Sequence, residues 1–440
     1  MKKLIALLLA TLMVFSMAAC NGKAKDSSTP TADSSAPSSD AGPAEPVTIK
    51  FANYAILEAG YTEFWEGVKS GFEAKYPNIK IEWVSAPYGE IVNQVINMAG
   101  GGDKVDLMFS ELSWTPTLEE AGLAAPIGTI LSKEFIDDFY PSVIEAATIK
   151  GKAYSIPMYI SPYVLYYNKE LFKQAGLDPE QPPKTYDEML KMAEKLSTLK
   201  TKDGNKVYAF GQTTASVPVS GSSLTAMVYN FGGNVLNADG QLDIDNQGFK
   251  DAFSMIKTLD EKGYNPQNSK LKDLRNLFAL GQLAMYYDQS WGFNGVKSIN
   301  PEAENFIASA APLSGGSGTG ESLLQDHSLI LMDNGDAKKE AVRLLVEYLI
   351  TPEMLADYMS TITPAFPAKK SMENMDTIVN NKILKGAVGS VSKVKSITSI
   401  PTLSDLNLEL CTLAQSVTVG GKSVEQGIAD FQAAAEGIVG

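Results

Sequence analysis

The sequence predicts an α/β fold divided into two lobes. Strand-like and helix-like segments alternate along the start of the folded body, a pattern typical of a mostly parallel sheet covered by helices. The chain has 440 residues, which exceeds what one hydrophobic core usually supports, so two lobes or domains are expected. Hydrophobic residues make up 44% of the composition and charged residues 20%, as in an ordinary globular protein.

The alternation is clearest between residues 47 and 110. Segments 47–51 and 79–83 alternate apolar and polar residues and predict strands. Segment 63–76 places its apolar residues on one helical face and predicts a helix. A second helix is predicted over 90–99, where a run of glycines closes it, and a third strand over 105–110.

The rest of the body repeats this logic less regularly. Thr185 and Glu188 form a capping-box pattern that opens a helix, and Ser423 and Gln426 form another before a terminal helix. The other predicted elements are a strand over 163–167, a short helix over 169–176, a helix over 271–280, a strand over 284–287 and an amphipathic helix over 336–349.

The first 19 residues are predicted to be a lipoprotein signal peptide. Lys2 and Lys3 precede an apolar run, Leu4–Ala19, which is too short for a comfortable membrane span. Small residues directly before Cys20 resemble the bacterial lipobox, in which that cysteine is lipidated. The alternative is a plain signal peptide, cleaved after Ala18 or Ala19, with Cys20 incidental.

Residues 20–46 are predicted to be a disordered tether. From residue 21 to 46 there is no Val, Ile, Leu, Met, Phe, Tyr or Trp, so this stretch cannot bury apolar surface. With lipidation at Cys20, the tether would hold the body outside the cytoplasm, anchored to the cell membrane.

The composition excludes several functions. A formal net charge of -14 argues against nucleic acid, whose phosphates require a basic face. One histidine and two cysteines exclude His/Cys zinc sites and iron–sulfur clusters, and no metal or cofactor is predicted. Cys411 lies among apolar residues, which indicates a buried structural thiol.

No catalytic motif is recognisable. Gly420–Ser423 resembles the end of a phosphate-binding loop, but Ser416 occupies the position of the required glycine. Gly315–Gly320 fits a connecting loop better than a dinucleotide fingerprint. His327 has no recognisable triad around it, so a polar or ligand-contacting role is favoured over a catalytic one.

Aromatic residues instead mark a candidate binding site. Such rings stand at Tyr54, Tyr88 and Trp114 after the three successive strands, at Trp291 after a later strand, and at Tyr159 and Tyr163 around Ser161. The carboxyl ends of strands in a helix-covered parallel sheet open onto the ligand crevice. Flat rings with nearby carboxylates suit a neutral polyol. The alternative, a core position, is favoured for Trp65 and Trp83.

These features come together in a family resemblance. The strongest stretches are Gly151–Pro157, Tyr166–Phe172 and Pro182–Glu188, supported by Phe72–Ile79, Val105–Leu107 and Gly281–Met285. With these stretches in order, the body from Val47 onward resembles the extracellular solute-binding proteins of ABC importers, in the branch that includes sugar-binding proteins. The resemblance implies a periplasmic-binding-protein-like fold with interleaved lobes joined by hinge segments.

The resemblance also implies lobe boundaries and a mechanism. Lobe 1 would comprise 47–157 and 313–362, and lobe 2 would comprise 158–312 and 363–440. Bound solute would favour closure of the lobes about the hinge. The closed complex would then deliver its solute to the transmembrane permease subunits of an ABC transporter.

Candidate ligand-binding residues follow from position in the family. They are Asn53, Tyr54, Tyr88, Glu111, Trp114, Ser161, Tyr163, Ser222, Asp288, Trp291, Phe366 and Asp405. Serine stands at Ser110, Ser161 and Ser220, where better-known maltose binders carry aromatic or acidic groups, so a malto-oligosaccharide is not specifically predicted.

The ligand class remains open among a few alternatives. Arginine forks usually grip anions, and the chain contains only Arg275 and Arg343, both in helical segments. This favours a mono- or oligosaccharide, or a polar or cationic solute held by rings. A ligand sensor for a membrane signalling protein shares every feature, whereas a secreted enzyme would need placed carboxylates that the sequence does not identify. A binding protein without enzymatic activity is therefore expected.

Overall fold

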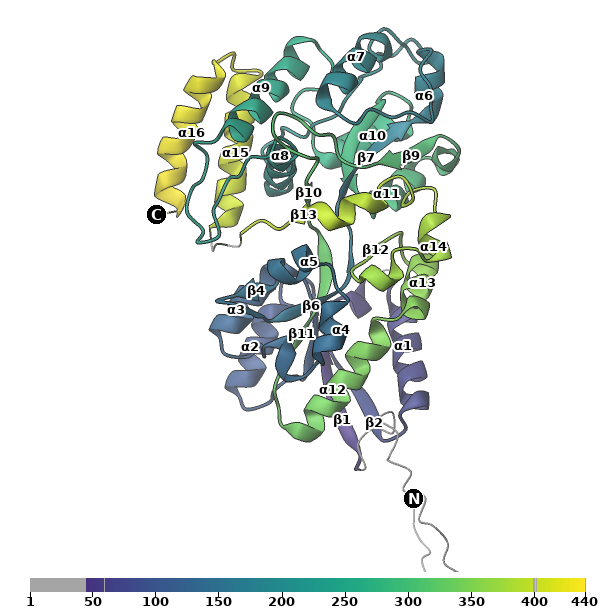
Figure 1. Cartoon of the computed structure of the whole chain (residues 1–440), viewed down its shortest axis with the longest axis vertical. Helices are drawn as coiled ribbons and strands as arrows, with labels where there is room; N and C mark the ends of the chain where they lie inside the picture. Colours follow the sequence, from purple (N-terminus) through teal and green to yellow (C-terminus); the bar gives the residue numbers. More distant parts are fainter. Residues whose placement is uncertain (1–44, 59, 399, 401, 440) are drawn as a thin grey trace, which may run out of the picture. The chain divides into compact units, whose positions relative to one another are not determined.

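The computed structural model describes residues 45–58, 60–398, 400 and 402–439 (Figure 1). The predicted signal peptide and Cys20 lie outside these described residues. Nowhere in the described part of the chain is a helix both long and apolar enough to span a membrane.

A six-stranded sheet organises one part of the body. Its strand order is β12-β6-β11-β3-β1-β2. The strands are β1 (Val47–Ala52), β2 (Ile79–Val84), β3 (Leu107–Ser110), β6 (Ser155–Ile160), β11 (Asp326–Leu331) and β12 (Phe366–Pro367). β1 pairs in parallel with β2 and β3, whereas β11 pairs antiparallel with β3 and β6, and β12 antiparallel with β6. The predicted mostly parallel sheet is therefore right for the first three strands and wrong for the others, which return from later segments in the opposite direction.

Local sequence patterns explain the first strands and helices. Val47, Ile49 and Phe51 of β1 are buried, as the alternation predicted. Helix α1 (Thr62–Lys75) buries Phe64, Trp65, Val68 and Phe72, and helix α2 (Ile91–Gly100) buries Ile91 and Val95. The rings of Trp65 and Trp83 both pack on Phe51. Trp65 is fully buried, which confirms its predicted core position, whereas Trp83 is half-buried at the edge of this core and its indole N–H donates to Glu66.

A second sheet, of three strands, lies further along the chain. Its order is β8-β7-β9, with both pairings antiparallel. The strands are β7 (Tyr163–Asn168), β8 (Met285–Gln289) and β9 (Ile307–Ala310). Only Ser161 and Pro162 separate β6 of the first sheet from β7 of the second, so the chain crosses between the sheets within two residues. Figure 1 shows this crossing between β6 and β7.

Helices surround the second sheet (Figure 1). They are α6 (Lys169–Gln174), α7 (Tyr186–Leu196), α8 (Pro218–Asn230), α9 (Gln247–Glu261), α10 (Leu271–Ala279), α11 (Gly292–Ile299), α15 (Leu403–Val417) and α16 (Val424–Val439). The predicted caps hold at both places, because the Thr185 hydroxyl accepts the Glu188 N–H at 3.1 Å and the Ser423 hydroxyl accepts the Gln426 N–H at 3.2 Å.

The remaining elements are shorter or lie against the first sheet. Helix α12 (Asp336–Leu349) is amphipathic as predicted and buries Ala341, Leu344 and Leu345. The others are α3 (Thr115–Glu120), α4 (Lys133–Asp137), α5 (Pro141–Ala146), α13 (Pro352–Thr361), α14 (Asp376–Val379), β4 (Thr148–Ile149), β5 (Lys152–Ala153), β10 (Ser322–Leu323) and β13 (Val394–Lys395). Short 3-10 helices cover Ala55–Leu57, Leu112–Trp114, Ile127–Thr129, Pro301–Asn305, Lys370–Met372 and Val388–Lys393.

The sheets define two lobes, but the exact residue limits of each stay a prediction. Strand β12 (Phe366–Pro367) pairs within the six-stranded sheet, while α15 and α16 pack in the second hydrophobic core with Leu165 and Phe172. Both follow residue 362, so the C-terminal part of the chain contributes to each lobe.

Cys411 and the glycine-rich loop have the structural roles predicted for them. Cys411 is fully buried on α15, and burial raises the pKa of its thiol to about 11. A thiol held in this way is unreactive at neutral pH. Gly315–Gly320 connects β9 to β10 without forming a helix or strand.

Candidate ligand-binding site

Three aromatic side chains pack together beyond the ends of β1, β2 and β3. The ring centroids of Tyr54 and Tyr88 lie 5.1 Å apart, those of Tyr54 and Trp114 lie 5.5 Å apart, and those of Tyr88 and Trp114 lie 5.1 Å apart. Parallel pairing brings the carboxyl ends of the three strands to one edge of the sheet. Tyr54 is buried and Tyr88 is 45% exposed. We call Tyr54, Tyr88 and Trp114 the aromatic wall.

His327 of β11 connects this wall to both sheets. Its Nε2 lies 3.0 Å from the Tyr54 hydroxyl and its Nδ1 lies 2.8 Å from the Tyr159 hydroxyl. Burial lowers the pKa of His327 to about 3, so the ring is neutral at physiological pH. Trp291, which follows β8 of the second sheet, stacks on His327 with a centroid distance of 4.8 Å and an interplanar angle of 13°. Trp291 therefore reaches from the other lobe to His327, the residue that bonds to Tyr54 of the aromatic wall.

Two carboxylates lie beside the wall. The Tyr88 hydroxyl donates to Glu111 Oε2 at 3.0 Å. Asp326, which is 7% exposed, accepts the Leu112 N–H at 3.3 Å and also the hydroxyl of Ser328. Burial raises the pKa of Glu111, and raises that of Asp326 to about 7. These groups can accept hydrogen bonds from hydroxyl or ammonium donors.

Ser161 lies at the crossing between the sheets, as predicted. Its hydroxyl is 2.7 Å from that of Ser290 and accepts the Trp291 N–H at 3.4 Å. The Ser161 N–H donates to Gln325 O at 2.7 Å, and the Ser290 hydroxyl donates to Pro364 O at 2.9 Å. This network fixes the backbone that carries Trp291 against the segments that precede β11 and β12.

Asp288 was predicted to bind ligand, but its carboxylate is already paired within the protein. Its carboxylate is fully buried and forms a two-pronged ion pair with Arg275 of α10, with both N···O distances at 2.7 Å. The Tyr286 hydroxyl and the Gln289 N–H also donate to it, at 3.2 and 2.9 Å. The carboxylate thus has an internal partner, because α10 returns along β8 and places Arg275 beside it.

Other predicted site residues lie in the protein interior. Asn53 is buried and its side-chain oxygen accepts the Ala55 N–H at 2.9 Å, while its amide nitrogen has no hydrogen-bond partner among the described residues. Tyr163 is 2% exposed, and its hydroxyl likewise lacks a described partner. Phe366 is fully buried and belongs to the first hydrophobic core, so its ring serves packing.

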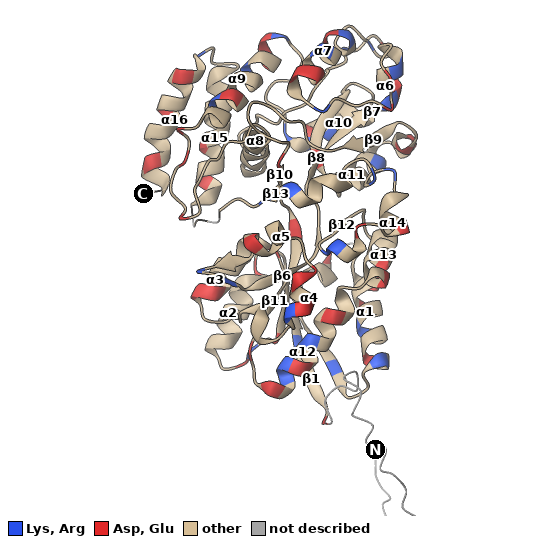
Figure 2. Ribbon diagram, in the orientation of Figure 1, with Lys and Arg blue, Asp and Glu red and all other residues tan. Residues whose placement is uncertain are grey.

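Ser222 and Asp405 lie apart from the aromatic wall's contacts. Ser222 of α8 accepts the side-chain N–H of Asn407 at 3.4 Å, and Asp405 is exposed in the first turn of α15. Three neighbouring buried oxygens, those of the Gln212, Ser220 and Asn407 side chains, lack partners among the described residues. Helix α8 carries no charged residue, as Figure 2 shows. Helix α8 thus offers a neutral surface beside these unpartnered oxygens, with Asp405 as the nearby acidic residue on α15.

Asp326 and Ser290 were missed by the sequence reasoning. Asp326 is the first residue of β11, whose six residues are all buried. A charged residue that opens a strand ending in the apolar run Leu329–Leu331 is the signal that could have found it. Ser290 gave no comparable signal, because its partners come from residues 161 and 364.

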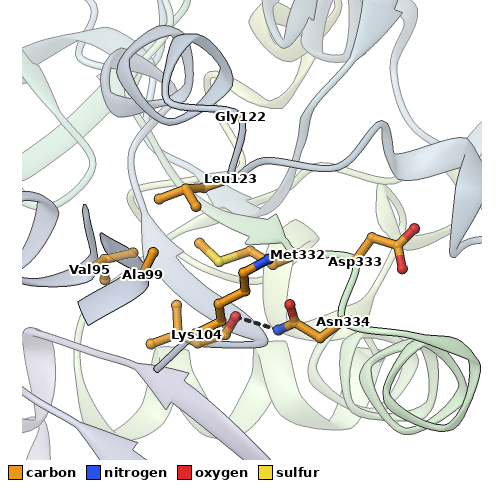
Figure 3. A pocket seen from close by; sticks show the side chains of 9 residues that line it. Val95, Ala99, Lys104, Gly122, Leu123, Met332, Asp333 and Asn334 are labelled. Carbon is orange, nitrogen blue, oxygen red and sulfur yellow. Dashed lines mark hydrogen bonds between the residues drawn. The ribbon is translucent and has the colours of Figure 1, made fainter. Parts of the chain in front are cut away.

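A separate hollow lies at the opposite end of the first sheet. Val95, Ala99, Leu123 and Met332 contribute its apolar lining, and the Asn334 amide donates to Val105 O at 2.8 Å (Figure 3). Val105 precedes β3 and Met332 follows β11, whereas the aromatic wall lies beyond the carboxyl end of β3. The hollow and the aromatic wall are therefore distinct.

Two α/β lobes, a short chain crossing and a cluster of rings and acceptors at that crossing define a protein that binds a solute between lobes. The chain belongs to the bacterial extracellular solute-binding protein family, whose model matches residues 54–356. This membership confirms the predicted two-lobed fold and solute-binding function, and places the protein among binding proteins of the cell exterior.

Relatives and solved structures agree with this assignment. A Brucella abortus protein, whose name describes it as a binding protein and specifies no ligand, is 26% identical over 92% of this chain and 95% of its own length. The mannitol-binding protein of Pseudomonas aeruginosa is 30% identical over 29% of each chain. The cyclic alpha-maltosyl-1,6-maltose binding protein of Arthrobacter globiformis superposes with a TM-score of 0.77, covering 90% of this chain and 99% of its own, at 18% identity. At that identity the superposition establishes the fold alone.

Proposed function

We propose that this protein is the substrate-binding receptor of an ABC importer and captures a saccharide between its two lobes. The observation that carries the proposal is the stack of Trp291, from one lobe, on His327 of the other, next to the aromatic wall and two carboxylates. Sugar rings present C–H faces that pack on aromatic rings and hydroxyls that donate to carboxylates.

The ligand contacts would come from both lobes. Tyr88, Glu111 and Trp114 are the predicted site residues of the first lobe that keep some exposure. From the second lobe, Trp291 contributes its indole, whose N–H has no described partner. Tyr54 and Ser161 hold this arrangement in place through His327 and Ser290. Asn53, Tyr163, Phe366 and Asp288 would support the site from the interior, and Ser222 and Asp405 would belong to its far side.

Similar proteins support a polyol or saccharide ligand. One relative is named for mannitol and one structural neighbour for a cyclic maltosyl-maltose, and both ligands are rich in hydroxyl groups. The ion pairs also favour an uncharged ligand over an anion, because both arginines already have partners. Arg275 pairs with Asp288, and Arg343 pairs with Glu340 and Glu347.

Closure about the chain crossing would couple binding to delivery. The two lobes would approach each other around bound solute. Their proposed limits are 47–157 and 313–362 for lobe 1 and 158–312 and 363–440 for lobe 2, except that residues 158–160 and β12 pair within the sheet of lobe 1. The closed form would dock on transmembrane permease subunits. Lipidation of Cys20 and the 20–46 tether would keep the receptor at the outer face of the cell membrane. The protein would release its solute chemically unchanged, without enzymatic activity.

A thermal-shift panel tests this proposal. A ligand that binds only the native state stabilises that state, and at ligand concentrations above Kd the stabilisation grows with the logarithm of the ligand concentration. We expect at least one mono- or oligosaccharide, at millimolar concentration, to raise the melting temperature of the purified protein, and Trp291→Ala to lose this shift. A panel in which no saccharide acts, while another class of solute does, would contradict the proposal.

A further inference from the structure

The charge at the candidate site is uncompensated. Glu111 and Asp326 both lie beside the aromatic wall, and no ion pair of the described residues includes either of them. The side-chain atom Glu111 Oε1 also has no hydrogen-bond partner within the described residues, whereas Oε2 accepts the Tyr88 hydroxyl. The site thus offers one free carboxylate oxygen and a second acidic group behind it.

The groups that face these carboxylates are all neutral or acidic. Burial raises the pKa of Glu111, and the hydrogen bonds from Tyr88 and Ser113 lower it in part. Burial also raises the pKa of Asp326, and the negative charge of Glu111 raises it further. His327, next to Asp326, is neutral because burial lowers its pKa. Arg275, the arginine nearest in sequence to Trp291, has both ends of its fork on Asp288. Among the residues that the structure describes, no cation therefore pairs with Glu111 or Asp326.

Closure of the lobes over a neutral ligand would bury the Glu111 carboxylate without a counterion, which weakens binding of that ligand. Covering a carboxylate with a neutral molecule removes water and leaves the charge unpaired, which disfavours the ionised form. A ligand cation placed at Glu111 Oε1 would pair that charge with a strong, charge-assisted hydrogen bond. The neighbouring rings of Tyr88 and Trp114 also attract a cation through their faces.

We infer that the natural ligand presents a protonated amine to Glu111, so that the receptor selects an amino sugar over its neutral counterpart. This inference rests on the proposed saccharide-binding function and specifies its substrate class. Glu111 supplies the direct acceptor, Tyr88 orients it, and Asp326 adds negative potential from behind. The aromatic wall and Trp291 bind the sugar ring itself.

Matched saccharide sets provide the test. Each set contains an amino sugar, its N-acetyl derivative and its neutral parent. One set is glucosamine, N-acetylglucosamine and glucose, and further sets are the short β-linked oligomers of these three sugars. Calorimetric titration at pH 7 should show the amino member binding about tenfold to a hundredfold more tightly, as expected of one hydrogen bond to a charged group. Glu111→Gln should bring the members within about threefold of one another, whereas the control Glu119→Gln on α3 should preserve the preference.

Proton linkage gives a second readout that a merely structural role of Glu111 would not produce. Binding of a cation favours ionised carboxylates, lowers their pKa and releases protons, so affinity rises with pH until the amine itself deprotonates. Binding of a neutral ligand raises the same pKa values and takes protons up. Titrations in buffers of different ionisation enthalpy at pH 6, where the ligand amine is already protonated and Asp326, with a pKa of about 7, still holds its proton, should show proton release.

The outcomes separate this inference from the proposed function. Equal or tighter binding of the neutral member, with proton uptake, would overturn the amine and leave the saccharide receptor standing. Binding of choline or putrescine with no response to any saccharide would support the cation site and overturn the saccharide. A preference for the amino member that survives in Glu111→Gln would also overturn the role assigned to Glu111.

Discussion

The buried ion pair between Arg275 and Asp288 allows a quantitative prediction. In Arg275→Met, the Asp288 carboxylate, which has no exposed surface, would lose its cation and keep only the donors Tyr286 Oη and Gln289 N. Breaking a buried pair by removing one partner typically costs about 3–5 kcal/mol. Because these two donors remain, we expect a loss of about 3 kcal/mol in the free energy of unfolding, measured by urea denaturation.

Arg343→Met is the matched control. The Arg343 side chain is 24% exposed and that of Arg275 is 27% exposed, but the Arg343 partners Glu340 and Glu347 are 41% and 31% exposed. Pairs of that kind contribute only about 0–1 kcal/mol. The double variant Arg275→Met/Asp288→Asn should recover most of the loss, because a neutral amide leaves no unpaired charge. If Arg275→Met costs no more than Arg343→Met, then Asp288 is not the internally paired carboxylate described above.

Three further predictions concern stability alone. In Gly221→Ala the new Cβ would lie 2.3 Å from Asn407 O, so α8 and α15 must separate at a cost of about 1–3 kcal/mol in the free energy of unfolding. The control Gly67→Ala, on the open face of α1, should instead stabilise the protein by about 1 kcal/mol. Equal effects of the two variants in urea denaturation would contradict the close approach of α8 and α15. Asn168 accepts the N–H groups of Glu170 and Leu171 at 3.0 Å, so Asn168→Ala should cost about 1 kcal/mol, whereas an unchanged midpoint would argue against this cap. Asp326 keeps its proton in the folded protein up to a pKa of about 7 but loses it near pH 4 when unfolded. Between these two pH values the free energy of unfolding should therefore fall by about 1.4 kcal/mol per pH unit relative to Asp326→Asn. Parallel pH profiles of the two proteins would refute the raised pKa of Asp326.

Local sequence patterns predicted the elements whose partners are close in the chain. The period-two alternation of β1 and the apolar face of α1 follow from residues within a few positions of each other, and both segments fold as expected. The carboxyl-end placement of Tyr54, Tyr88 and Trp114 followed from the same βαβ logic, and the structure brings these rings into contact.

Long-range pairing explains what the sequence could not predict. The antiparallel course of β11 depends on contacts with β3 and β6, more than 150 residues earlier. Asp288 looked like a ligand-binding residue because its partner Arg275, 13 positions before it, reaches it only through the fold of α10 against β8. Asp326 and His327 become part of the candidate site because of their cross-strand and cross-lobe neighbours.

The most direct test of the central claim is calorimetric titration of the saccharide that gives the largest thermal shift, with Trp291→Ala beside the unchanged protein. Trp83→Ala is the control, because Trp83 packs on Phe51 and Trp65 and its indole N–H donates to Glu66. We expect Trp291→Ala to abolish measurable binding without lowering the unliganded melting temperature by more than a few degrees, and Trp83→Ala to lower stability while retaining affinity. Unchanged affinity in Trp291→Ala would contradict a ligand site at the junction of Trp291, His327 and the aromatic wall.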